Sequence, residues 1–84
     1  MIQEAIGRVE EMERHLELLL EAERAGETPD ARALEALTAY YQGGLWLRDY
    51  ELDERGLLPT TLKRGVLGQD TVYDLLERLR DRTN

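Results

Sequence analysis

Apolar residues recur at helical spacing from the start of the chain. Steps of three and four alternate along this stripe, whose members are Ile2, Ala5, Val9, Met12, Leu16 and Leu19. This period is typical of an amphipathic helix, and Ile6 and Leu20 widen its apolar face to the breadth of a core-facing helix. Gly26 then offers the left-handed conformation in which many helices end. The pattern predicts one long helix over residues 2–25.

A second helix is predicted to begin at the sequence Thr28-Pro29-Asp30. Thr28 is a capping residue type, Pro29 fits the first helical position, and Asp30 suits the positive end of the helix dipole. The apolar stripe that follows contains Ala31, Leu34, Leu37, Thr38 and Tyr41. The pair Gly43-Gly44 ends this helix. Because only a few residues join the two helices, we expect them to form an antiparallel hairpin.

A short third helix and an irregular segment are predicted next. The helix covers residues 45–56, ends at Gly56, and cannot easily continue through Pro59. Residues 57–68 mix apolar anchors with proline and glycine, so we expect an irregular path with one helical turn at residues 60–64. Trp46 follows directly after the hairpin, and we expect it to be largely buried where the hairpin meets the second half.

The last stretch of the chain predicts a final helix over residues 69–82. Its stripe consists of Val72, Leu75, Leu76 and Leu79, with Tyr73 beside it. Asp70 is expected in the first turn, where an acidic side chain complements the helix dipole. Just before this helix the chain must turn back, and glycine at position 65 suggests a positive φ there.

These elements predict an all-α fold, a small bundle in which residues 1–84 form one domain. Residues 1–43 form the long N-terminal hairpin. Residues 44–84 form the C-terminal half, with the short middle helix, the irregular segment containing proline and glycine, and the C-terminal helix. The chain has 84 residues and no cysteine, so neither disulfides nor thiolate metal sites stabilise it. The fold must therefore be stabilised by the packing of helices, either within one chain or against the helices of a second chain.

The net charge of the chain argues against two classes of binding partner. A formal net charge of −7 opposes binding to nucleic acid and to an anionic membrane surface. The longest apolar run, Leu18-Leu19-Leu20, is far too short to span a bilayer, and Met1-Ile2-Gln3-Glu4 does not resemble a signal peptide. We therefore expect a cytoplasmic protein. The acidic first helix either attracts a basic partner or is simply a solvated face.

One group of charged residues is the best candidate for a site. Asp49 and Asp53 stand four apart, so a helix places both carboxylates on one face, next to Glu54. With Lys63 and Arg64 they could hold magnesium and a phosphate group. The alternative is that the acids pair with Lys63 and Arg64 and fix the 57–68 segment. We favour the structural interpretation and expect no catalytic residue, cofactor or metal.

The remaining chemistry in the sequence is sparse. Serine and cysteine are both absent, which removes the commonest nucleophiles. His15, the single histidine, stands among charged residues and is expected to be exposed. The aromatic residues, Tyr40, Tyr41, Trp46, Tyr50 and Tyr73, form either part of the core or, with Arg48, a recognition patch.

From Tyr40 onward the chain also carries a family resemblance. The residues that carry it are Tyr40-Tyr41, Trp46, Asp49, Asp53-Glu54, Gly56, Leu58-Pro59, Leu62-Lys63-Arg64-Gly65-Val66-Leu67, Asp70 and Tyr73-Asp74-Leu75-Leu76. This pattern resembles the small bacterial family called domain of unknown function 4298, as does the glutamate-rich stretch at residues 10–13. The match covers roughly residues 9–80, with Gly68-Gln69 where the family has Ser-Glu. The resemblance implies an intracellular, mostly helical bacterial protein and no known activity.

The sequence therefore favours a non-enzymatic protein–protein interaction module with a partner that it does not identify. The alternative is a small metal- or phosphate-binding protein, or phosphohydrolase, that uses Asp49, Asp53 and Glu54. A homodimer through the N-terminal helix is also expected. A helix of 24 residues is about 36 Å long, whereas each later helix reaches only about 21 Å. A dimer would bury Ile2, Ile6, Val9 and Met12 of both chains. In a monomer, two shorter helices laid end to end would cover the same stripe.

Overall fold

The computed structural model describes residues 2–83, and Met1 and Asn84 lie outside the described part. The elements are α1 (Ile2–Ala25), α2 (Ala31–Gln42), α3 (Leu45–Glu54), the 3₁₀ helix η1 (Gly65–Leu67) and α4 (Thr71–Thr83). No strand occurs within residues 2–83, so the predicted all-α class is confirmed. None of the helices in this range has both the length and the apolar content that crossing a membrane requires.

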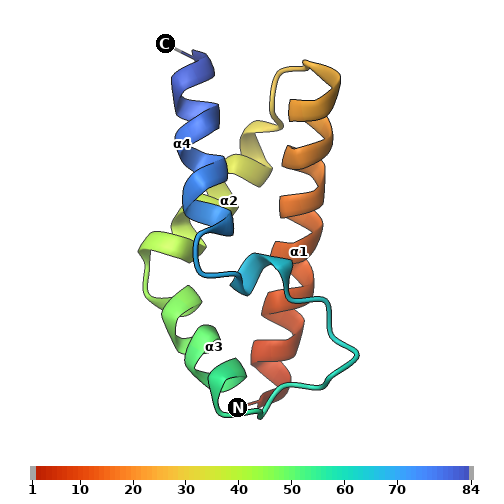
Figure 1. Cartoon of the computed structure of the whole chain (residues 1–84), viewed down its shortest axis with the longest axis vertical. Helices are drawn as coiled ribbons and strands as arrows, with labels where there is room; N and C mark the ends of the chain where they lie inside the picture. The colour runs from red at the N-terminus through yellow and green to blue at the C-terminus, as the bar shows by residue number, and fades with distance from the viewer. Residues whose placement is uncertain (1, 84) are drawn as a thin grey trace.

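Helix α1 is the longest element and organises the molecule, whose longest dimension is 38 Å. Helix α2 runs back antiparallel to α1, while η1 and then α4 follow one another along α1 (Figure 1). The predicted stripe is buried from Ala5 through Val9, Met12 and Leu16 to Leu19. The shorter elements together cover this stripe, but α2 and α4 pack against each other and do not lie end to end along α1. Val9 and Met12, expected at a dimer seam, lie inside the chain's own core.

Helix α2 departs from the prediction at its start. Asp30, not Thr28, is the N-cap, because its Oδ1 accepts a hydrogen bond from the backbone N of Ala33 at 2.9 Å. The helix begins only at Ala31, so Pro29 precedes it. An aspartate in the capping position can bond the third helical N–H, which the more distant threonine cannot reach.

The buried face of α2 is also rotated by one residue from the predicted one. Ala33, Leu37 and Tyr40 are buried, Leu34, Thr38 and Tyr41 are only half-buried, and Ala31 is exposed. Both sets have helical spacing and share Leu37, so spacing alone does not distinguish them. The packing of α2 against α1 decides between them, and it leaves the row through Leu34 and Tyr41 at the edge of the core.

The turns of the second half also differ in detail. Gly56 ends α3 with φ of +71°, as expected, but the helical turn lies at η1 and not at residues 60–64. Helix α4 begins at Thr71, so Asp70 precedes the first turn, and its backbone O accepts a hydrogen bond from Asp74 N at 2.8 Å. The core then closes with Leu58, Val66, Leu67, Val72, Leu75 and Leu79.

The prediction of a positive φ at Gly65 is wrong. Among the described glycines only Gly26, Gly44 and Gly56 have positive φ. A side chain at position 65 meets a different obstacle, because a Cβ there would lie 3.0 Å from Oε2 of Glu13. Glycine therefore allows a carboxylate of α1 to approach the backbone, and the chain reverses without a left-handed residue at this point.

Candidate functional site

A buried polar network joins three helices around Asp49. This residue of α3 is 0% exposed, and its carboxylate accepts two hydrogen bonds from Arg8 of α1, from Nε to Oδ2 at 3.0 Å and from Nη2 to Oδ1 at 2.5 Å. The hydroxyl of Tyr40 on α2 donates to Oδ2 at 2.8 Å. Asp49 was expected to pair with Lys63 or Arg64. It instead faces the hairpin, because it lies on the inner side of α3.

The network keeps complementary charges inside the protein. Burial, and then the hydrogen bond to Asp49, raise the pKa of the Tyr40 hydroxyl far above its usual value. The hydrogen bond to Asp49 raises the pKa of Arg8 as well. Tyr40 therefore stays a neutral donor and Arg8 a cation across the ordinary pH range. Both oxygens of Asp49 accept hydrogen bonds and the residue is 0% exposed, so its carboxylate does not face solvent.

The other charged residues of the predicted cluster have separate partners. Asp53 forms an ion pair with Arg64, which also donates to the backbone O of Pro59. Lys63 reaches across to Glu17 of α1, with 3.5 Å between Nζ and Oε1. These contacts attach the 57–68 segment to α3 and α1.

The three acids of that cluster therefore do not converge. A hydrogen bond with the Glu54 carboxylate raises the pKa of Tyr50, so Glu54 is engaged within its own helix. Asp49 and Asp53 have the separate partners just described. No group of three acidic, histidine or cysteine side chains that could hold a metal ion occurs within residues 2–83. The arrangement connects elements of the fold and offers no common binding point.

The backbone of Val66 is held at both ends by side chains from other helices. Glu13 of α1 accepts a hydrogen bond from Val66 N at 2.9 Å, and Nε1 of Trp46 donates to Val66 O at 2.9 Å. Trp46 lies at the predicted joint but is half-buried, with Tyr41 edge-on at 5.2 Å and Tyr50 stacked at 5.0 Å between ring centroids. Sequence reasoning did not single out Glu13, although it lies beside the apolar stripe and in the glutamate-rich stretch at residues 10–13 that resembles the family.

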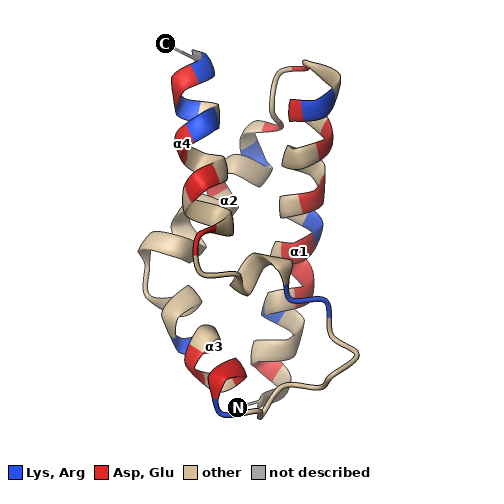
Figure 2. Cartoon of the chain, viewed as in Figure 1, with Lys and Arg blue, Asp and Glu red and all other residues tan. Residues whose placement is uncertain are grey.

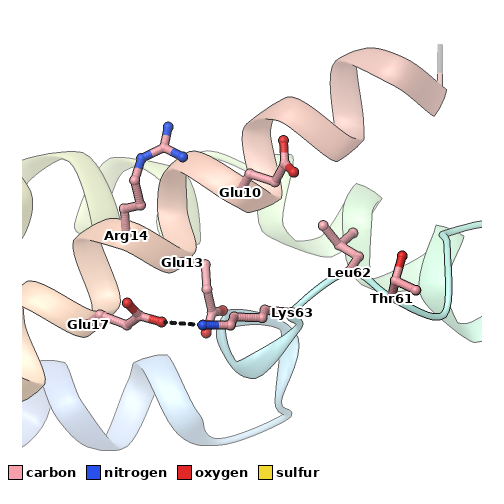
Figure 3. Close-up of a pocket in the computed structure, with 7 residues that line it drawn as sticks. All are labelled: Glu10, Glu13, Arg14, Glu17, Thr61, Leu62 and Lys63. Atoms are coloured by element: carbon pink, nitrogen blue, oxygen red, sulfur yellow. Dashed lines mark hydrogen bonds and ion pairs between the residues drawn. The ribbon is translucent and has the colours of Figure 1, made fainter.

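A shallow acidic hollow of about 260 Å³ lies between α1 and the 57–68 segment. Its lining consists of Glu10, Glu13, Arg14, Glu17, Thr61, Leu62 and Lys63. Figure 3 shows the Lys63 amine directed toward Glu17, while Arg14 points away from both. Acidic residues gather along α1, whereas both signs of charge alternate near the end of α4 (Figure 2). The chain's own lysine thus already fills part of this hollow.

A larger groove, of about 540 Å³, lies between α2 and α4. Its lining consists of Leu34, Thr38, Tyr41, Gln42, Tyr73, Leu76, Glu77, Leu79 and Arg80. Tyr73 is 50% exposed, and Leu34, Tyr41 and Leu76 are half-buried. Of these residues, Tyr41 and Tyr73 belong to the aromatic recognition patch that the sequence offers as one alternative. The rotation of α2 places the row through Leu34 and Tyr41 here, which the sequence did not reveal.

His15 is half-buried, which corrects the expectation of an exposed side chain. It adjoins the buried Leu16 on α1 and so lies at the edge of the core. Its Nε2 is 3.7 Å from Oε2 of Glu11, and its buried Nδ1 has no hydrogen-bond partner in the described part of the chain.

A comparison with known proteins agrees with the resemblance found in the sequence. The family model described as Domain of unknown function (DUF4298) matches residues 2–83, nearly the whole chain. No curated protein and no solved structure matches this chain.

Proposed function

The chain belongs to the DUF4298 family, whose description assigns no activity, and we propose from its surface that it is a non-enzymatic protein-interaction module. Its partner docks in the groove between α2 and α4. The observation that carries this proposal is Tyr73, a large aromatic side chain half exposed beside a concave, largely apolar surface.

The groove has the chemistry of an interaction surface. Leu34, Tyr41 and Leu76 are packed on one side only and keep apolar surface in contact with water. A partner that covers them removes that surface at a gain of about 25 cal/mol per Å². Tyrosine and arginine are the residue types that contribute most at protein interfaces, and Tyr73 and Arg80 stand on the same helix face. Glu77 and Arg80 provide a polar rim.

Metal-dependent chemistry receives no such support. The carboxylate of Asp49 is buried and bonded to Arg8 and Tyr40, and Asp53 is paired with Arg64. We expect magnesium or manganese at millimolar concentration to leave the melting temperature unchanged, since a ligand stabilises only by binding the native state. Differential scanning fluorimetry measures this. A rise of several degrees that disappears in Asp53→Asn would instead favour a metal-binding protein.

Site-specific photo-crosslinking in cells tests the interaction proposal. Tyr73 is replaced by the photo-reactive amino acid benzoyl-phenylalanine, and Leu57, which is 49% exposed and lies far along the chain from the groove residues, serves as the matched control position. We expect a discrete covalent adduct from position 73 and none from position 57. Absence of an adduct at position 73, or equal labelling from both positions, would overturn the proposal.

A further inference from the structure

We infer that the groove between α2 and α4 is occupied by the same surface of a second copy of this chain, with the two α4 helices antiparallel about a twofold axis. This inference rests on the proposed function and names its partner. The sequence predicted a homodimer through α1, but Val9 and Met12 of that helix are buried. The proposed interface is therefore the groove between α2 and α4, where Tyr73 is exposed.

Helix α4 has two distinct rows of side chains. Val72, Leu75 and Leu79 face the core and are buried. A second row contains Tyr73, Leu76, Glu77 and Arg80, all of which line the groove. Steps of three, one and three separate the members of this row, the spacing with which one helix packs along another. The second row is thus a helix-packing seam beside the core and not a scatter of exposed residues.

The charges in this seam are complementary when the two helices run in opposite directions. Tyr73 and Arg80 lie at equal distances before and after the midpoint between Leu76 and Glu77. A twofold axis at that midpoint therefore sets Tyr73 against Arg80 of the partner subunit, and the reverse. Each guanidinium then meets a tyrosine ring, a favourable cation–π contact. A parallel arrangement would instead set Arg80 against Arg80 of the partner subunit.

The groove also provides a recess for the tyrosine. Helices α2 and α4 run in opposite directions (Figure 1), so Leu34 lies toward the Arg80 end of the groove and Tyr41 toward the Tyr73 end. In the antiparallel pair, the partner's Tyr73 arrives at the Arg80 end and packs against Leu34. Glu77 lies near the axis, beside the partner's Glu77, and its charge is offset by the ion pair with Arg80 of its own chain.

A second copy fits this surface better than an unrelated partner because every contact occurs twice. Projection and recess are on the same face of the same chain, which is the condition for a closed twofold dimer. Each subunit contributes one acid and one base to the seam, so the interface carries no net charge. A chain of this size also has a small core of its own, and sharing apolar surface extends it.

Sedimentation equilibrium combined with charge reversal provides the test. We expect the mass of the wild-type chain to rise from 9.7 kDa toward twice that value as concentration increases through the micromolar range. Arg80→Glu should weaken the dimer at least tenfold, and Arg80→Lys should weaken it less. Arg32→Glu, the same charge change at an exposed position of α2, should leave it unchanged. A wild-type mass that stays at 9.7 kDa would overturn the inference.

The absence of cysteine allows a direct check of the geometry. Glu77→Cys places a thiol near the proposed axis, and oxidation should link two chains rapidly. Glu21→Cys, exposed on α1, is the matched control and should remain unlinked. Linking through position 21 and not 77 would overturn the proposed axis. An adduct from position 73 that is not twice the chain mass would refute the homodimer but keep the interaction module, whereas a monomer without any adduct would refute both.

Discussion

Asp49 illustrates at the scale of single residues how a small core accommodates a buried charge. Its two oxygens accept three hydrogen bonds, two of them from one guanidinium. Removing a carboxylate from water costs free energy, and an ion pair together with further hydrogen bonds to the carboxylate offsets that cost. Asp53, by comparison, forms its ion pair with Arg64 where both side chains are partly exposed, and such pairs contribute little. Two aspartates one turn apart therefore differ greatly in importance.

We expect Asp49→Ala to lower the free energy of unfolding by about 3–5 kcal/mol, because the substitution leaves the Arg8 cation without its partner inside the protein. Asp53→Ala, the control on the same helix, should cost less than about 1 kcal/mol. Urea denaturation of the two variants measures the difference. Equal losses of unfolding free energy in the two variants would show that the network around Asp49 contributes no more to stability than the ion pair of Asp53.

Tyr40 predicts the behaviour of the protein in alkali. The folded state raises the pKa of its hydroxyl, so this contribution to stability is complete below the unfolded value of 10.0 and is lost as pH rises beyond it. We expect the urea midpoint of the wild-type chain to fall steadily above about pH 10. In Tyr40→Phe the decline should be shallower. Identical slopes in the two proteins would contradict this assignment.

At the scale of elements, the attachment of η1 to α1 depends on a contact between side chain and backbone. Glu13 bonds the backbone N of Val66, and Gly65 leaves room for the carboxylate to do so. The indole of Trp46 holds the carbonyl of the same residue. A single turn of 3₁₀ helix has little stability of its own, so these bonds from α1 and α3 fix its position. Through η1 they also fix where α4 begins.

A double-mutant cycle tests this contact. Gly65→Ala should cost about 1 kcal/mol, because the new Cβ forces the Glu13 carboxylate away from Val66 N and weakens that hydrogen bond. In a Glu13→Ala background the same glycine substitution should cost much less, since the obstacle is gone. Chemical denaturation of the wild-type chain, the two single variants and the double variant gives the coupling energy. Additive effects would mean that the cost of Gly65→Ala does not come from the contact with Glu13.

At the scale of the whole molecule, one long helix is covered by shorter elements on two sides. The apolar stripe of α1 meets α2 along one side and η1 and α4 along the other. Leu18 is 55% exposed although it belongs to the longest apolar run of the chain, because it lies off the stripe. The stripe thus forms part of the core of one chain, and the groove between α2 and α4 keeps apolar side chains such as Leu34 and Leu76 partly in contact with solvent.

This arrangement predicts different outcomes for two charges placed on α1. Val9→Glu should unfold the chain, because Val9 is 0% exposed and an unpaired carboxylate there costs several kcal/mol. Leu18→Glu should change the free energy of unfolding by less than about 0.5 kcal/mol. Circular dichroism during thermal melting distinguishes the two variants. A folded, monomeric Val9→Glu protein would restore α1 as the dimer seam.

The sequence by itself determined the elements whose causes are local. The 2–25 helix, its stop at Gly26 and the end of α3 at Gly56 follow from apolar spacing and from the freedom of glycine to adopt positive φ. The family pattern was equally visible in the residues, and the family match confirms it. These features depend on neighbours within a few positions of each other, so a linear pattern is enough to predict them.

Only the tertiary structure decided which surfaces meet. Spacing allowed two buried faces for α2, and packing against α1 selected the one through Ala33 and Tyr40. Likewise Asp49 had nearer charged neighbours in sequence than Arg8, yet the inner side of α3 faces α1. The partner of a side chain depends on how separate helices approach one another, and no local rule contains that information. The groove between α2 and α4, which is the candidate site, also depends on which face of α2 packs against α1.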